Sequence, residues 1–174
     1  FYIQDASARM AVMVSDPRPG MRVLDACAAP GGKSIAAALA MKDEGSVLSC
    51  DLNPRKLGLI GPAAQRLGIH GIETEAADGR LYRPVWDGVF DVVLADVPCS
   101  GLGTIRKKPE IRYKDPAGFD GLPAVQAALL DNLCRYVRPG GVLLYSTCTV
   151  RTRENEAVVR TFLAAHPSFS AEAF

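Results

Sequence analysis

The sequence predicts a Rossmann-like α/β domain, with a mostly parallel sheet covered by helices on both faces. Short, continuously apolar stretches alternate along the chain with longer helical ones. A second observation is that a carboxylate or a thiol follows at or just after the end of several of these apolar stretches. In parallel sheets, ligands bind beyond the carboxyl ends of the strands, near the reversal of strand order. We therefore expect one composite site that contains Asp25, Asp51, Asp78, Asp96 and Cys148.

The N-terminal half of the chain is expected to contribute three strands and two helices. We predict strands at 21–27 (MRVLDAC), 46–51 (SVLSCD) and 72–78 (IETEAAD), of which the last has the weakest pattern. An Ala-rich helix at 31–42 follows the first strand. A second helix is predicted from 54 to 67, because Pro54 suits a first helical turn.

The C-terminal half is expected to add two strands and two helices. The stretch FDVVLADVP at 90–98 predicts a strand with an apolar centre between Asp91 and Asp96. A loop at 98–116 then leads to a helix near 122–136. We predict the fifth strand at 140–148 (GGVLLYSTC) and the last helix at 153–166.

Length and composition indicate one globular domain, residues 1–174. No apolar run approaches the roughly 20 residues needed to cross a bilayer, so no membrane partner is expected. The net charge of +1 argues against a general electrostatic attraction to nucleic acid but leaves room for local basic patches. The chain begins with Phe1 and without a signal peptide, so we interpret it as a piece of a longer protein.

The cysteines are scattered along the chain. They are Cys27, Cys50, Cys99, Cys134 and Cys148. No two of them form a C-x-x-C pair, so no structural metal is expected, and a reducing, cytoplasmic setting is the default. A buried, inert thiol is the usual fate of a lone cysteine. This interpretation is kept for Cys27, Cys50 and Cys134.

The stretch DACAAPGGKS links the first strand to the first helix. It does not match a phosphate-binding loop, because Cys27 stands where that motif needs glycine, and the dinucleotide pattern G-x-G-x-x-G fails as well. What remains is a backbone loop with free N–H groups at a helix N-terminus, which suits a carboxylate. A tight turn without a ligand is the alternative. The candidate cofactor-binding residues of this loop are Cys27, Ala28, Ala29, Pro30, Gly31, Gly32 and Lys33.

Two acids extend this candidate cofactor site. Asp51, which ends the second strand, is placed to accept hydrogen bonds from both hydroxyls of a ribose. Asp78, after the third strand, is placed to accept from an adenine amino group. Each acid alone is more often a cap or turn residue. Together with the loop they indicate a cofactor that contains adenosine, and S-adenosylmethionine fits because its amino-acid end offers a carboxylate.

The stretch ADVPCSG carries the first thiol. Methyltransferases that act on amino groups have an Asn/Asp-Pro-Pro-Tyr signature at such a strand end, whereas here Cys99, and no aromatic residue, follows the proline. An amine needs no covalent help, but C5 of a pyrimidine is a poor nucleophile. A thiolate that adds to C6 makes C5 electron-rich. A cysteine beside a methyl donor therefore suits C5 methylation.

The motifs CAAPGGK, PCSG and STC, in this order, resemble the RNA cytosine-C5 methyltransferases of the Sun (RsmB) group, and the resemblance covers essentially the whole chain. It implies a methyltransferase fold dependent on S-adenosylmethionine. It also implies that Cys148 is the nucleophile, that Cys99 helps to release the product, and that Asp96 contacts the cytosine and the cofactor. Methylation of an amino nitrogen remains the competing enzymatic interpretation.

The same resemblance implies how this chain differs from complete members. The usual fold has seven strands, the last two forming a hairpin after the final helix, and this chain stops before them. Val97 replaces a small residue usual between Asp and Pro-Cys. We interpret the chain as a monomeric catalytic domain without the N-terminal RNA-binding module. Small-subunit ribosomal RNA is the preferred substrate, with transfer RNA methylation or a silent RNA- and cofactor-binding module as alternatives.

Basic residues flank the two predicted active-site cysteines and are candidate RNA contacts. Tyr113 lies among them and is suited to stack on a base. The phosphate-contact candidates are Arg106, Lys107, Lys108, Arg112, Lys114, Arg151 and Arg153. A solvated basic loop is the alternative. Neither His70 nor His166 is placed as an activating base, and both are expected at the surface.

Overall fold

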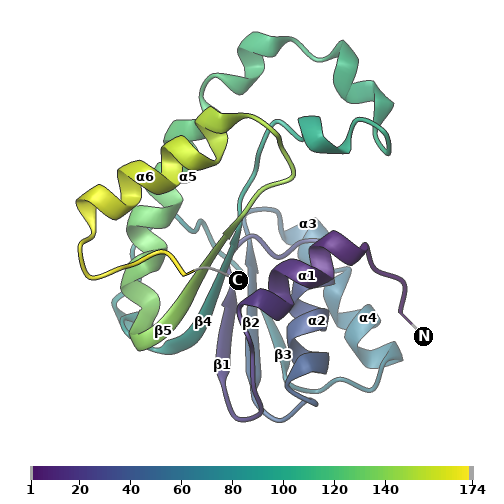
Figure 1. Ribbon diagram of the computed structural model, residues 1–174. Coiled ribbons are helices and arrows are strands. Elements are labelled where there is room, and N and C mark those ends of the chain that lie inside the picture. Colours follow the sequence, from purple (N-terminus) through teal and green to yellow (C-terminus); the bar gives the residue numbers. More distant parts are fainter. Residues whose placement is uncertain (1, 173–174) are drawn as a thin grey trace.

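A computed structural model describes residues 2–172 and confirms the predicted α/β fold (Figure 1). Its sheet has five strands in the order β3-β2-β1-β4-β5, and every neighbouring pair is parallel. The strands are β1 (Arg22–Asp25), β2 (Ser46–Asp51), β3 (Ile72–Ala76), β4 (Phe90–Asp96) and β5 (Val137–Ser146). The strand order reverses at β1 and β4, so the carboxyl ends of these two strands form the expected binding edge.

Helices cover both faces of the sheet. They are α1 (Ala6–Val14), α2 (Gly32–Ala40), α3 (Pro54–Leu57), α4 (Ile60–Arg66), α5 (Leu122–Leu133) and α6 (Glu156–Ala165). Successive strand residues point to opposite faces. Leu24 and Val93 therefore pack under α5 and α6, whereas Val23 and Val92 pack under α1, α2 and α4. Two apolar layers thus fix the sheet and the loops that leave it.

Most elements differ from their predicted bounds by a few residues, and three of these differences affect the site or the helices. The helix expected at 54–67 is divided into α3 and α4, because Pro62 has no N–H to donate to the carbonyl of Gly58. Strand β5 begins at Val137 and ends at Ser146, so Cys148 lies in the following loop rather than in the strand. Before α6, a 3-10 turn occupies Thr152–Glu154.

Helix α1 was not predicted. Asp5 caps its N-terminus and accepts a hydrogen bond from the Ser7 amide at 3.0 Å. Its buried residue, Val12, packs against α2 and the sheet.

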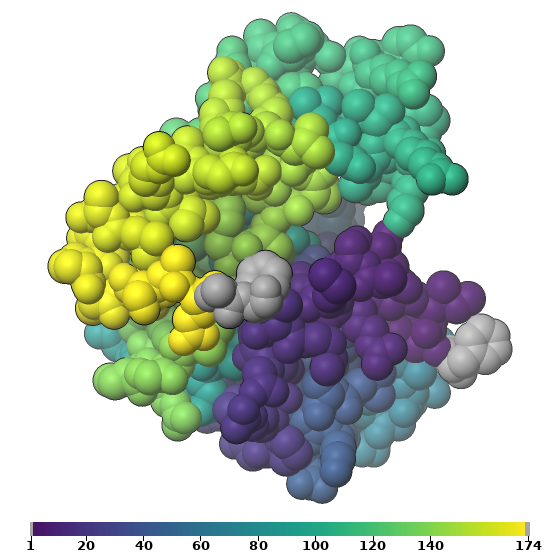
Figure 2. All heavy atoms as spheres, viewed as in Figure 1, coloured from purple at the N-terminus to yellow at the C-terminus, as the bar shows by residue number. Residues whose placement is uncertain are grey.

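The loop expected after β4 contains three 3-10 turns, at Leu102–Thr104, Pro109–Tyr113 and Pro116–Phe119. They form a lobe that rises from the binding edge of the sheet, and a hollow separates this lobe from α1 (Figure 2). Within residues 2–172, no helix has the length and apolar character required to cross a membrane.

Gly31 determines how the chain enters α2. Its φ of 104° lies in the left-handed region, and a Cβ there would stand 2.7 Å from Cγ1 of Ile60 in α4. We predict that Gly31→Ala lowers the free energy of unfolding by about 2 kcal/mol. In Gly61→Ala, a helical position with open space, stability should be unchanged or slightly higher. Urea denaturation measures both, and equal stability of the two variants would contradict this account.

Candidate active site

A pocket of about 690 Å³ lies beyond the carboxyl ends of the strands. The predicted residues Cys27, Ala29, Asp51, Asp78 and Asp96 line it together, and Val125 and Leu129 of α5 contribute apolar surface. A smaller pocket of about 170 Å³ adjoins it and is lined by Pro30, Gly32 and Lys33, among others. Cys27, Ala29 and Asp96 line both pockets. The structure thus brings the predicted cofactor residues to one edge of the sheet.

The loop between β1 and α2 is tied to the end of β2. The Ala28 amide donates to the Cys50 carbonyl at 2.8 Å, and the Ala29 amide donates to Oδ2 of Asp51 at 3.2 Å. Oδ1 of Asp51 accepts from the Asn53 amide at 2.9 Å. Asp51 therefore faces the pocket with its carboxylate fixed by backbone donors from both sides.

Asp78 lines the same pocket but is already paired. Nη2 of Arg80 lies 2.6 Å from Oδ2 of Asp78, and the Arg80 amide donates to Oδ1 at 3.0 Å. The hydrogen bond from the Arg80 side chain lowers the pKa of Asp78. An adenine amino group would therefore have to share this carboxylate with Arg80.

Asp96, at the end of β4, receives two donors. Nζ of Lys33 lies 2.6 Å from its Oδ2, and the hydroxyl of Ser146 donates to Oδ1 at 2.8 Å. The sheet register sets the second contact, because Asp96 is paired directly with Ser146. Ser146 was not among the predicted site residues, since its role depends on the register between two distant strands.

Asp25 lies buried beneath this pair. Its Oδ2 accepts from the Ser34 hydroxyl at 2.7 Å, whereas Oδ1 has no hydrogen-bond partner among the residues that the structure describes. Burial raises the pKa of Asp25 to about 7. The binding edge therefore contains a buried carboxyl group that is protonated more readily than an exposed aspartate.

The two cysteines singled out from the sequence are in contact. Sγ of Cys99 lies 3.1 Å from Sγ of Cys148, and the Cys148 amide points at the Cys99 sulfur at 3.2 Å. The hydrogen bond from Cys99 lowers the pKa of Cys148 to about 6, although burial and Asp96 oppose the shift. The same hydrogen bond, together with burial, raises the pKa of Cys99. The direction of these shifts favours Cys148 as the sulfur that ionises and Cys99 as the thiol that donates to it.

The thiols of the other three cysteines are disfavoured from ionising. Burial raises the pKa of Cys27 and of Cys50 to about 12, and it raises the pKa of Cys134 as well. Cys148 is the exposed cysteine, whereas Cys50 and Cys134 are buried. At neutral pH, Cys148 should be the reactive thiol of the protein.

The predicted RNA contacts fall into two groups. Those in the lobe after β4 are exposed: Arg106, Lys107, Lys108, Arg112 and Lys114, with Tyr113 90% exposed. Lys107 forms an ion pair with Asp5. Arg151 differs, because its guanidinium is largely buried between Glu154 and Asp120. Arg153 is also paired with Asp120.

The two histidines make their contacts with residues other than Cys99 and Cys148. His70 is exposed, as expected. His166 is half-buried, because its Nε2 lies 2.9 Å from Oδ1 of Asp131 and its ring stacks on Phe162. Neither is hydrogen-bonded to Cys99 or Cys148 in the part of the chain that the structure covers.

These residues fit S-adenosylmethionine. The larger pocket offers a carboxylate, Asp51, suited to a ribose, and apolar side chains suited to an adenine ring. The loop beside it ends in the helix N-terminus at Gly32, which suits the carboxylate of the methionine part. Fold and residues together are of the class found in methyltransferases that depend on S-adenosylmethionine.

Comparison with known proteins gives the family. Residues 12–174 match the family described as 16S rRNA methyltransferase RsmB/F, and the chain belongs to that family. It is 44% identical over 169 residues to the probable ribosomal RNA small subunit methyltransferase B of Bacillus subtilis, with 96% of this chain and 38% of that protein covered. It is 36% identical over 170 residues to the ribosomal RNA small subunit methyltransferase F of Cronobacter sakazakii, with 96% and 35% covered.

Solved structures show the same fold over most of this chain. The crystal structure of PH0851 gives a TM-score of 0.92 at 36% identity and covers 95% of this chain and 38% of that one. NSun6 from Pyrococcus horikoshii, solved with the S-adenosylmethionine analogue SFG, gives a TM-score of 0.83 at 27% identity, with 95% and 42% covered. The chain thus spans well under half the length of these relatives.

We predict that the alkylation rate of Cys148 by iodoacetamide rises with pH to a midpoint near 6 and then levels off. Cys99→Ala removes the donor that stabilises the thiolate, so the midpoint should rise toward the ordinary thiol value of about 8.5. At pH 7 the rate should fall roughly tenfold or more. Peptide mapping by mass spectrometry measures the modification at position 148. An unshifted midpoint would show that the Cys99 contact does not activate Cys148.

Proposed function

We propose that this chain transfers a methyl group from S-adenosylmethionine to C5 of a cytosine in RNA of the small ribosomal subunit, through a covalent bond between Cys148 and C6. The observation that carries the proposal is the contact between Cys99 and Cys148, with Sγ atoms 3.1 Å apart. Neither cysteine lines the two pockets, but Cys99 directly follows Pro98, which lines the larger one. Asp96 lines both pockets and is close enough to act on Cys148 electrostatically. Family membership supports ribosomal RNA as the substrate.

In the proposed reaction the target base leaves its stack and enters beside Asp96. The Cys148 thiolate adds to C6, and the electron pair of the C5–C6 double bond becomes available at C5. Bound S-adenosylmethionine supplies an electrophilic methyl group to that carbon. A base then takes the C5 proton, the C5–C6 double bond forms again, and the electron pair of the S–C6 bond returns to Cys148.

Cys99 has a role in this last step. In the proposed mechanism its S–H donates to the Cys148 sulfur, which lies 3.1 Å away, and so stabilises the thiolate as the S–C6 bond breaks. One contact therefore serves both halves of the reaction: it favours the thiolate before attack and makes that thiolate a better leaving group afterward.

Asp96 suits recognition of cytosine. Lys33 and Ser146 both direct donors at its carboxylate, so Asp96 acts as an acceptor in this arrangement. An acceptor fits the 4-amino group of cytosine rather than its N3, which is itself an acceptor. Uracil has a carbonyl at position 4 and would face the carboxylate unfavourably. The pair of Lys33 and Asp96 therefore supports a preference for cytosine.

The basic lobe is the proposed phosphate-binding surface. Arg106, Lys108, Arg112 and Lys114 are exposed and follow Cys99 in the chain, so they are available to an RNA backbone near the active site. Lys107 would have to exchange its ion pair with Asp5 for a phosphate. Arg151 is the weakest candidate, since its guanidinium already has two carboxylate partners.

We predict that Cys148→Ala abolishes transfer of labelled methyl groups to RNA, with a loss of roughly a thousandfold or more. Cys99→Ala should form the covalent species more slowly but fail to release it, so a protein–RNA band accumulates on a denaturing gel. Cys134→Ala is the matched control and should keep its activity, because Cys134 is buried near α6.

Methylation retained in Cys148→Ala would contradict the thiol mechanism and favour an amino nitrogen as the methyl acceptor. Normal turnover without a retained band in Cys99→Ala would remove the release role of Cys99. Binding of cofactor and RNA without any methyl transfer would favour a silent binding module. Sequencing of the methylated RNA separates ribosomal from transfer RNA as the substrate.

A further inference from the structure

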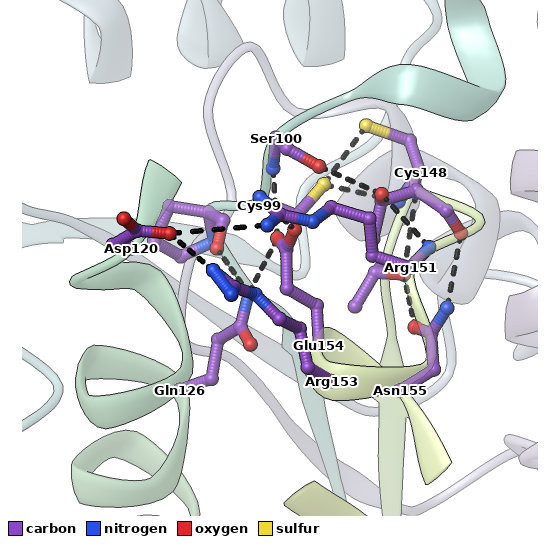
Figure 3. A network of polar contacts seen from close by, with 12 residues as sticks. Cys99, Ser100, Asp120, Gln126, Cys148, Arg151, Arg153, Glu154 and Asn155 are labelled. Carbon is purple, nitrogen blue, oxygen red and sulfur yellow. Dashed lines mark hydrogen bonds and ion pairs between the residues drawn. The ribbon is translucent and has the colours of Figure 1, made fainter. Parts of the chain in front are cut away.

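A buried acid holds the loop that carries Cys99. Glu154, in the 3-10 turn before α6, is fully buried, and its Oε2 accepts from the Ser100 amide at 2.8 Å (Figure 3). Gln126 of α5 donates to the same Oε2 at 3.2 Å and to the Pro98 carbonyl at 3.0 Å. The residues on both sides of Cys99 are therefore tied to a single carboxylate, one directly and one through Gln126.

The next residue in the chain holds the loop that carries Cys148. Oδ1 of Asn155 accepts from the Thr147 hydroxyl at 2.6 Å, and its Nδ2 donates to the Thr149 carbonyl at 3.0 Å. Both neighbours of Cys148 are thus bound to one amide side chain. The hydroxyls of Ser100 and Thr149, 2.7 Å apart, then join the two loops directly.

The surroundings of Glu154 make its burial energetically costly. Its Oε1 has no hydrogen-bond partner among residues 2–172, and the nearest cation is Nη1 of Arg151 at 3.5 Å. A buried carboxylate is costly unless it is paired, and a buried ion pair is by itself weak evidence for stability. The specific feature of Glu154 is that its contacts meet the backbone beside Cys99, while the adjacent Asn155 meets the backbone beside Cys148.

We infer that Glu154 and Asn155 act together as the positioning residues of the methyl-transfer site, setting Cys99 against Cys148 although neither touches the reacting sulfurs. The inference rests on the proposed thiol mechanism for its link to catalysis. A displacement of about 1 Å at a reacting group can cost about a hundredfold in rate. Because the two residues are consecutive, any shift of this turn moves both loops at once.

The test uses Glu154→Gln in the purified protein. The amide keeps the size of the side chain and one acceptor for Ser100, but it removes the charge and places an N–H₂ group against donors. We expect the pH midpoint for iodoacetamide modification of Cys148 to rise by at least about half a unit. The kcat for methyl transfer to RNA should fall roughly tenfold, while KM for S-adenosylmethionine changes less than about twofold.

Glu156→Gln is the matched control. It removes the same charge two residues away, from an exposed side chain of α6, and should leave both the midpoint and kcat unchanged. Asn155→Ala is the second variant, used with a thermal melt in case Glu154→Gln does not fold. It loosens the Cys148 loop alone and should raise the same midpoint.

A folded Glu154→Gln or Asn155→Ala protein with the midpoint of the unmodified chain would overturn the inference. An equal shift in Glu156→Gln would also overturn it, because general electrostatics would then explain the effect. The proposed function fails separately: if the midpoints shift as expected but Cys148→Ala still methylates RNA, positioning stands and the C5 mechanism falls.

Discussion

The contact between the sulfurs of Cys99 and Cys148 is the interaction on which the proposed chemistry of this protein depends. It joins the loop after β4 to the loop after β5, two neighbouring parallel strands whose register pairs Asp96 with Ser146. Because the strands end together, residues a few positions further along each chain segment face one another. A free thiol has a pKa of about 8.5, so an unassisted cysteine would be largely protonated at neutral pH. In the proposed mechanism, the hydrogen bond from the second sulfur lowers the pKa of Cys148, and no histidine takes part.

The two halves of the sheet contribute different groups of candidate site residues. Strands β1 and β2 lead into the loop and Asp51, which suit the cofactor, whereas β4 and β5 lead into Asp96 and the two cysteines. The proposed reaction places the target base beside this second group. Lys33 bridges the halves, because it lies on α2 and pairs with Asp96 at the end of β4. In the proposed reaction, methyl donor and methyl acceptor meet at the reversal of strand order, where two neighbouring loops diverge.

Sequence patterns predicted the parts of the structure that depend on local periodicity. The five strands, their alternation with helices and the acids at their ends follow from apolar runs of strand length and from the turn residues between them. The break between α3 and α4 was missed although Pro62 carries a local signal for it. Glu154 could not be recognised, since RENE resembles the solvated start of a helix, and its burial arises from Ser100 and Gln126, which are distant in the chain. Arg151 is a candidate RNA contact from the sequence alone, because its carboxylate partners become apparent only in the folded chain.

The central claim is that the sulfur at position 148 bonds to C6 of a cytosine during methyl transfer. RNA in which the target cytosine carries fluorine at C5 tests it directly, because C5 then has no proton to lose and the S–C6 bond cannot break by elimination. With S-adenosylmethionine present, the account predicts a covalent complex whose peptide map places the nucleotide on Cys148. A complex attached at Cys99, or methyl transfer to this RNA without any covalent product, would contradict it.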